Sequence, residues 1–460
     1  MRALAAALLA ALPLSTLAAG PEVDADAGLD AFVHSDLGGG KGAFDRHLLW
    51  ALIGVAPDLL GDSEQAFFAR YGFIPDPDSE DHLPYGVTAH RDWLGIPKLQ
   101  VTCALCHVGR VADQTLLGAG NRELDLDRLF RDVRAAAREP RFTAGAAVDA
   151  AHEEARRRHE IWHLTDTFAL TAEVAALKST ASATSDDPAG PGLLHAARIA
   201  CARAGSEGAA APVKLPPVWS FGERRTLGAG GEMEGDLPDL LWGVATLVHG
   251  NPDGRARAAA SVSAIAAWMK DAAPPAFPGA VDPKLAKRGE AAFASHCASC
   301  HGTNARGDYQ ERFFPPSETG TDGARAAAVS ASCARALTSS LRGATASARG
   351  AYLAPNLDGA WARAPLLHNG SVPNLALLLD PPASRPAVFF TGVGVPYDPS
   401  ALGDRCTRAD EGGRFTCAPA RPNLFRYDTK APGRGNGGHP YGTDLPPEEK
   451  RALLEFLKTL

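Results

Sequence analysis

The sequence predicts a mainly α-helical protein with long loops, and three observations support this fold class. Apolar residues recur at intervals of three or four in several short segments, which is the spacing of one helix face. Strand signals, meaning runs of alternating apolar and polar residues, are sparse throughout. A short cysteine and histidine motif occurs twice, which predicts two similar helical pockets in one chain.

The composition indicates a folded, acidic chain that does not bind nucleic acid. Its 460 residues suffice for two or three domains, since a typical domain has about 150. Glycine and proline, with 47 and 35 residues, stay below the share at which unpatterned chains usually fail to fold. The formal net charge of −7 lacks the basic excess typical of phosphate-backbone binders, so nucleic acid is not an expected partner.

The first 19 residues have the layout of a secretory signal peptide. Arg2 is followed by an apolar run over residues 3–14 and then by small residues up to Ala19. A short membrane anchor is the alternative, but the run falls short of the about 20 residues that a span needs. We therefore expect a mature chain without a membrane span, periplasmic or secreted, in a compartment where disulfides persist.

Four of the eight cysteines lie in two copies of the pattern C-x-x-C-H, at Cys103–His107 and Cys297–His301. Two thiols at this spacing form thioether bonds to the two vinyl groups of a haem, and the adjacent histidine reaches the iron. Zinc and thioredoxin-like sites also use C-x-x-C, but they do not require a histidine directly after it. Two covalently bound c-type haems are therefore predicted, held by Cys103, Cys106, His107, Cys297, Cys300 and His301.

The other four cysteines are expected to form disulfides in an oxidising compartment. Cys406 and Cys417 flank a Gly-rich turn over residues 410–413 and are predicted to close a small loop. Cys201 and Cys333 form the remaining pair, with free thiols as the alternative.

Each motif is expected to anchor one cytochrome c-type haem domain, with the boundary in the Pro-rich stretch 271–279. We predict an N-terminal haem domain over residues 20–275, with an insertion near 131–215. A C-terminal cytochrome c domain is predicted over residues 280–460. The segment 179–192, rich in Ser, Asp, Pro and Gly, is expected to be a surface elaboration.

Three helices are predicted from their start signals. One runs from a cap at Asp62 or Ser63 to Gly72, one begins at residues 282–283 and leads into the second motif, and one begins at Pro446. Their apolar stripes are Phe67, Phe68 and Tyr71 in the first, Leu285, Gly289 and Phe293 in the second, and Leu453, Leu454, Leu457 and Leu460 in the third.

A charged helix is predicted around residues 152–163. Its histidines, His152, His159 and His163, fall on one face at spacings of seven and four. This face is either a solvated helix side or the source of a distal haem ligand.

Several short sequences accompany the two motifs. They are Tyr71-Gly-Phe-Ile, Leu83-Pro-Tyr-Gly86, Pro216-Pro-Val-Trp219, Arg363-Ala-Pro-Leu-Leu-His368-Asn-Gly-Ser371, Tyr427-Asp-Thr and Gly437-Gly-His439-Pro-Tyr441. With these pieces the chain resembles exported di-haem c-type cytochromes related to bacterial di-haem cytochrome c peroxidases, especially the branch with the rubber oxygenases. The likeness runs from about Tyr71 to Leu460 and is poor between residues 131 and 215.

In these relatives the first haem is the reactive one and the second passes electrons. A peroxidase-type second haem would take a methionine from downstream of its motif, yet the methionines here are Met1, Met233 and Met269. The second iron then takes a histidine, another weak ligand or no ligand on its far side. The resemblance to the oxygenase branch implies His439 as this ligand, with a surface loop histidine as the alternative. His368 is expected instead to hold a turn or to reach a haem propionate, and Arg363 is a second candidate for a propionate contact.

The resemblance also implies a catalytic residue between the haems. Trp219 is expected to serve as a relay or pocket residue, with plain core packing as the alternative. Glu223, Glu232 and Glu234 follow it and are candidate acid or base groups for O–O cleavage.

Two functions follow from these predictions. One is an oxidoreductase that activates peroxide or dioxygen at the first haem and receives electrons through the second. Its reaction would be peroxide reduction or cleavage of an apolar polymer, and the chain is noticeably shorter than the rubber oxygenases. The other is a non-catalytic periplasmic di-haem electron carrier. A small redox protein or another electron donor or acceptor is the expected partner of either.

Overall fold

The computed structural model describes residues 25–35, 37, 44–181, 187–249, 255–303, 309–408, 415–418 and 423–460, and the predicted signal peptide lies outside them. Helix makes up 42% of this part of the chain and strand 14%. The strands are two to five residues long and form sheets of two or three strands. The fold is therefore mixed rather than mainly α. The sequence did not reveal the strands because such short pairs leave almost no alternation to read.

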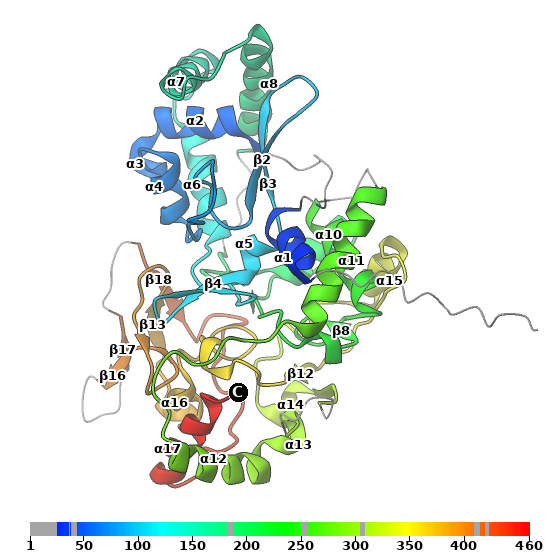
Figure 1. Cartoon of the computed structure of the whole chain (residues 1–460), viewed down its shortest axis with the longest axis vertical. Coiled ribbons are helices and arrows are strands. Elements are labelled where there is room, and N and C mark those ends of the chain that lie inside the picture. The colour runs from blue at the N-terminus through cyan, green and yellow to red at the C-terminus, as the bar shows by residue number, and fades with distance from the viewer. Residues whose placement is uncertain are drawn as a thin grey trace, which may run out of the picture.

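The first part of the chain forms a helical group at the top of Figure 1, in blue and teal. Its central helix, α2, lies against α7 and α8, and its core includes the fully buried Leu52 and Phe142. The helices are α2 (Arg46–Val55), α3 (Pro57–Leu60), α4 (Glu64–Arg70), α6 (Leu126–Arg138), α7 (Ala144–Arg157) and α8 (Leu164–Thr180). The antiparallel strands β1 (Phe44–Asp45), β3 (Pro97–Val101) and β2 (Val87–Arg91), in that order, form its sheet.

The helix predicted between Asp62 or Ser63 and Gly72 is confirmed as α4. The Ser63 hydroxyl accepts a hydrogen bond from the Ala66 backbone N–H at 3.2 Å, which makes Ser63 the cap. The helix ends at Arg70, and Gly72 follows with a φ of 77°.

The helix predicted around residues 152–163 is interrupted, so its three histidines do not share a face. α7 ends at Arg157, His159 has a φ of 59°, and His163 lies at the N-terminus of α8. The two motifs are on α5 (Ala104–His107) and α13 (Ala298–His301), and both lie well below α7 in Figure 1. The suggestion that this face supplies a haem ligand was therefore wrong.

The middle of the molecule is formed by helices and small sheets. α1 (Ala25–His34) packs on α11 (Arg255–Asp271), which contacts α10 (Leu237–His249). One sheet has the order β11 (Thr345–Ala346), β9 (Met233–Glu234), β8 (Thr226–Leu227). The two-stranded sheets in this part are β4 (Val108–Val111) with β5 (Gln114–Leu117), β6 (Leu193–Leu194) with β7 (Val213–Lys214), and β10 (Arg312–Phe314) with β12 (Tyr352–Ala354).

The remaining elements belong mainly to the last third of the chain. The strand pairs are β13 (Val388–Thr391) with β18 (Phe425–Asp428), β14 (Tyr397–Asp398) with β15 (Gly403–Asp404), and β16 (Cys406–Arg408) with β17 (Phe415–Cys417). The helices are α9 (Ala196–Arg203), α14 (Pro316–Thr319), α15 (Ala331–Ser340) and α16 (Leu375–Leu378). Three short 3₁₀ turns cover Phe221–Glu223, Ala360–Ala362 and Pro382–Ser384.

The two predicted helices of the C-terminal half pack against each other at the bottom of Figure 1. They are α12 (Pro283–His296), capped by Asp282, and α17 (Pro447–Leu457). A Cβ at Gly289 would lie 1.9 Å from the carbonyl oxygen of Ala452. The close approach of the helices therefore requires glycine at this position.

Gly289→Val is expected to destabilise the protein by about 1–3 kcal/mol, because the added side chain pushes α12 away from α17. The midpoint of urea unfolding, followed by circular dichroism, measures this effect. Gly145→Ala is the matched control, since Gly145 lies in α7 with no atom within 4 Å of an added Cβ. An equal midpoint for the Gly289→Val variant and the unmodified protein would contradict the prediction.

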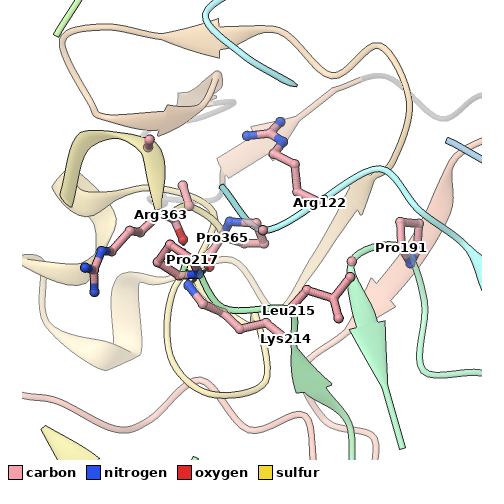
Figure 2. A pocket seen from close by; sticks show the side chains of 11 residues that line it. Arg122, Pro191, Lys214, Leu215, Pro217, Arg363 and Pro365 are labelled. Atoms are coloured by element: carbon pink, nitrogen blue, oxygen red, sulfur yellow. Dashed lines mark hydrogen bonds between the residues drawn. The ribbon is translucent and has the colours of Figure 1, made fainter. Parts of the chain in front are cut away.

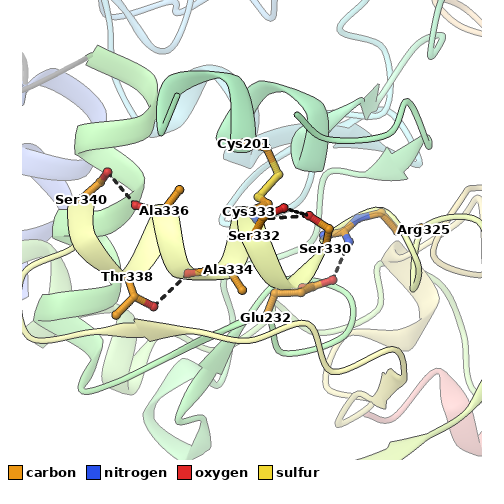
Figure 3. Close-up of a disulfide and its surroundings, with 10 residues drawn as sticks. All are labelled: Cys201, Glu232, Arg325, Ser330, Ser332, Cys333, Ala334, Ala336, Thr338 and Ser340. Atoms are coloured by element: carbon orange, nitrogen blue, oxygen red, sulfur yellow. Dashed lines mark hydrogen bonds and ion pairs between the residues drawn. A yellow bond between two sulfur atoms is a disulfide. The ribbon is translucent and has the colours of Figure 1, made fainter. Parts of the chain in front are cut away.

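Both predicted disulfides are confirmed. Cys201 of α9 is bonded to Cys333 of α15, 132 residues further along the chain, as Figure 3 shows. Cys406 and Cys417 are bonded across the strand pair β16 and β17. The four motif cysteines are free thiols.

None of the helices in the described residues is long and apolar enough to span a membrane.

Candidate functional site

The first motif forms one tight turn between two strands. β3 ends at Val101, α5 covers Ala104–His107, and β4 starts directly afterwards. Cys103 and Cys106 are half-buried, and burial raises the pKa of Cys103 to about 11 and that of Cys106 to about 12. Cys103 and Cys106 are therefore uncharged thiols, and they lie on the same turn as His107.

The orientation of His107 is set by a backbone carbonyl. Its Nδ1 lies 2.9 Å from the carbonyl oxygen of Pro216, and only a protonated Nδ1 can donate to that oxygen. Burial lowers the pKa of His107 to about 4, so the ring is neutral. A neutral ring with the proton on Nδ1 leaves Nε2 free to bind a metal, which is the usual arrangement of a histidine ligand.

The second motif repeats this arrangement with different partners. The Nδ1 of His301 lies 2.7 Å from the carbonyl oxygen of Pro355. Burial lowers the pKa of His301 and raises that of Cys297 to about 11. In both motifs, therefore, a proline carbonyl fixes the orientation of the histidine ring through Nδ1 and leaves Nε2 available to bind a metal.

The predicted ligand His439 faces His301. The centroids of the two rings are 6.2 Å apart. Two imidazoles that bind one metal from opposite sides, each through a bond of about 2 Å, have centroids about 6 Å apart. The Nδ1 of His439 is buried without a hydrogen-bond partner among the described residues, and burial is the main cause that lowers the pKa of His439 to about 4. This pair therefore fits an iron held between two neutral imidazoles.

The loop that carries His439 is held by a buried arginine. Arg385 is 5% exposed, and burial lowers its pKa to about 10. Its guanidinium donates to five backbone carbonyls, those of Leu377, Leu378, Asn436, Gly438 and His439. Arg385 was not among the residues predicted from the sequence, because a contact to backbone carbonyls leaves no pattern in the side chains.

Trp219 lies three residues after Pro216, whose carbonyl holds His107, and its indole is directed at the segment that follows Pro355. Its Nε1 donates to the carbonyl oxygen of Leu117 at 3.0 Å, and the residue is 3% exposed. A Cβ at Gly118 would lie 2.5 Å from Nε1, and one at Gly359 would lie 2.6 Å from Cζ3. Gly118 donates to the His107 carbonyl, and Gly359 follows Pro355, so the indole is enclosed by both supports.

The other predicted site residues have different partners. Glu232 is buried and pairs with Arg325 at 2.5 Å, and Glu234 is exposed and pairs with Arg349 at 3.3 Å. The side chain of Glu223 lies outside the described residues. Glu232 is thus committed to an ion pair, which weakens its candidacy as an acid or base.

His368 holds a turn, as one of its two predicted roles requires. Its Nε2 lies 3.1 Å from the hydroxyl of Tyr352, and the two rings stack with centroids 4.2 Å apart. Burial lowers the pKa of His368 to about 3. Its backbone carbonyl accepts from the N–H of Lys214.

The two C-x-x-C-H turns and the free imidazole nitrogens define the class of a c-type haem protein. In agreement, the family model described as RoxA-like, cytochrome c-like matches residues 351–390. This segment contains Pro355, which holds His301, and Arg385, which holds the His439 loop. The match supports a cytochrome c-like relation to the rubber oxygenase branch, with covalently bound c-type haem and a haem-based redox role.

Two proteins of Sinorhizobium fredii (strain NBRC 101917 / NGR234) are similar to parts of the chain. The uncharacterized protein y4iJ is 42% identical over 119 residues, which cover 24% of this chain and 18% of y4iJ. The uncharacterized protein y4iM is 30% identical over 256 residues, which cover 49% of this chain and 56% of y4iM. The chain thus spans less than two thirds of either relative.

Proposed function

We propose that the protein is a di-haem c-type cytochrome oxidoreductase that activates peroxide or dioxygen at the first haem and passes electrons through the second. The two haem domains are assigned to residues 20–275 and 280–460. The reaction takes place outside the cytoplasm, and a small redox protein exchanges electrons with the second haem.

One observation carries this proposal, namely the asymmetry between the two proximal histidines. His301 faces His439 at a distance suited to a shared metal. Among the described residues, no second histidine ring faces His107 in this way. A second haem with two protein ligands suits electron transfer, and a first haem with one open side suits reaction with a small molecule.

The residues of the chain have separate tasks in this proposal. When bound, the haem irons supply the one-electron and oxygen chemistry. His107 and His301 each present Nε2 and keep the Nδ1 proton on a proline carbonyl. His439 excludes other ligands from the second haem, and Arg385 fixes the loop on which it lies. Trp219 provides an aromatic group between the two supports.

Spectra of the purified protein with cyanide or peroxide test the proposal. The absorption bands of one haem are expected to shift on addition of either, while those of the other stay constant. If neither haem responds, the protein is the alternative, an electron carrier with two six-coordinate irons. Product analysis with peroxide alone, or with an apolar polymer and dioxygen, then separates the two possible reactions.

Trp219→Phe is expected to slow electron transfer between the haems severalfold, because the larger indole fills the space between their supports. Stopped-flow reduction of the cyanide-free protein measures this rate. Trp50→Phe is the matched control, since Trp50 is also 3% exposed and also donates through its indole N–H, but to Glu64 in the helical group. Equal rates in the Trp219→Phe variant and the unmodified protein would assign Trp219 to core packing.

A further inference from the structure

Two short segments carry the carbonyl groups that hold the proximal histidines, and these segments lie side by side. Pro216 accepts from His107 at 2.9 Å, and Pro355 accepts from His301 at 2.7 Å. The first support segment is residues 214–220, and the second is residues 355–365. Contacts between these two segments therefore connect the surroundings of the two haem motifs.

Lys214 makes the most direct of these contacts. Its Nζ donates to the carbonyl oxygen of Arg363 at 2.6 Å and to that of Pro365 at 2.9 Å. Its backbone N–H donates to the carbonyl of His368 at 2.8 Å. Figure 2 shows the Lys214 side chain directed at the loop that carries Arg363 and Pro365, where these residues line a small pocket. One lysine thus binds the second support segment at two points and the turn after it at a third.

Arg363 continues the connection towards His301. In Figure 2 its guanidinium points away from Lys214, to the other side of the loop. There it donates to the carbonyl of Asn356 at 2.7 Å and to that of Asp358 at 2.9 Å. Asn356 directly follows Pro355, so the contacts run without a gap from the carbonyl that holds His107 to the one that holds His301.

The charge of Lys214 is balanced by backbone dipoles alone. Among the described residues no carboxylate forms an ion pair with it, and its two acceptors are carbonyl oxygens. Burial, and then the charge of Arg363, lower the pKa of Lys214 to about 7. A residue with only a packing role would more commonly be apolar here, because an enclosed ammonium group loses its hydration.

We propose that Lys214 is a positioning residue that couples the two haem sites. It fixes the first support segment to the second. A change of ligand or oxidation state at a haem held by His107 would therefore displace the carbonyl environment of His301, and a change at a haem held by His301 would displace that of His107. The coupling is reciprocal, as any coupling between two binding sites must be. The inference rests on the proposed presence of two haems, and it adds the residue through which they influence each other.

Redox titration of the full holoprotein tests this coupling. The midpoint potential of the second haem is measured with the first haem free and with it bound to cyanide, and the shift between the two values reports the coupling. In Lys214→Met we expect this shift to fall to about half or less of its original size. Lys178→Met is the matched control, because Lys178 also donates to a backbone carbonyl, that of Phe142, but in the helical group.

The possible outcomes separate a coupling role from a structural one. A lower melting temperature of Lys214→Met with an unchanged cyanide-induced shift would overturn the proposal. An unmodified protein that binds cyanide but shows no shift would also overturn it. Lys214→Arg retains the positive charge and the N–H donors, so it is expected to keep most of the cyanide-induced shift in potential. This variant keeps the proposal testable if Lys214→Met does not fold. If the unmodified protein binds no cyanide, the proposed function fails first. The coupling is then measured as the change in potential of one haem when the other is reduced.

Discussion

Replacing both cysteines of one motif by alanine is expected to remove one covalently bound haem and to leave the other in place. The variants are Cys103→Ala with Cys106→Ala, and Cys297→Ala with Cys300→Ala. Each pair lies on its own turn, and none of the four cysteines takes part in a disulfide. Since covalent attachment uses both thiols of one motif, each double variant should carry half of the haem of the unmodified protein.

Mass spectrometry of the denatured protein, together with haem absorbance, counts the attached groups. The control is the double variant Cys406→Ala with Cys417→Ala, which removes the disulfide between two cysteines 11 positions apart in the chain. This control should keep both haems. An unmodified protein with a single haem, or a double variant with the full amount, would show that one motif does not attach haem. This experiment therefore decides the number of cofactors directly.

His439→Ala is expected to convert the second haem from a low-spin to a high-spin or ligand-exchanging form. The ring of His439 lies 6.2 Å from that of His301, and no downstream methionine is present to replace it. Loss of the strong-field imidazole weakens the ligand field at the iron, and the open position then accepts cyanide. Electron paramagnetic resonance and cyanide titration measure both changes.

The control for this variant is His368→Ala. His368 is also a half-buried histidine downstream of the second motif, but it bonds to Tyr352. Its replacement should lower stability without changing the spin state. An unchanged low-spin signal in His439→Ala would assign the far side of the second haem to another ligand.

The parts of the site that the sequence predicted are those encoded locally. The two attachment motifs are five residues long, and the cap at Ser63 also follows from neighbouring residues. Gly289 was predicted only as part of an apolar stripe, and its contact with Ala452 depends on a helix far along the chain. The disulfide between Cys201 and Cys333 could be proposed by elimination, once four cysteines were assigned to haem. His439 was predicted from a resemblance and from the lack of a suitable methionine.

The parts that the sequence missed depend on backbone groups or on segments far apart in the chain. Pro216 and Pro355 act through carbonyl oxygens, which every residue possesses, so their roles have no side-chain signature. Arg385 and Lys214 likewise bind carbonyls. The helix predicted over residues 152–163 failed because α7 stops at Arg157, and His159 adopts a left-handed conformation that the histidine spacing does not reveal.

The disulfide between α9 and α15 places the maturation of this protein under a time constraint. Cys297 and Cys300 lie between Cys201 and its partner Cys333 in the chain. If the chain is exported from its N-terminus, Cys201 and both thiols of the second motif therefore reach the outside before Cys333 does. In the oxidising compartment that the sequence predicts, these thiols must stay reduced for haem while Cys201 must become oxidised. If the second motif attaches haem, as proposed, correct assembly depends on haem capturing Cys297 and Cys300 before Cys201 exchanges with them.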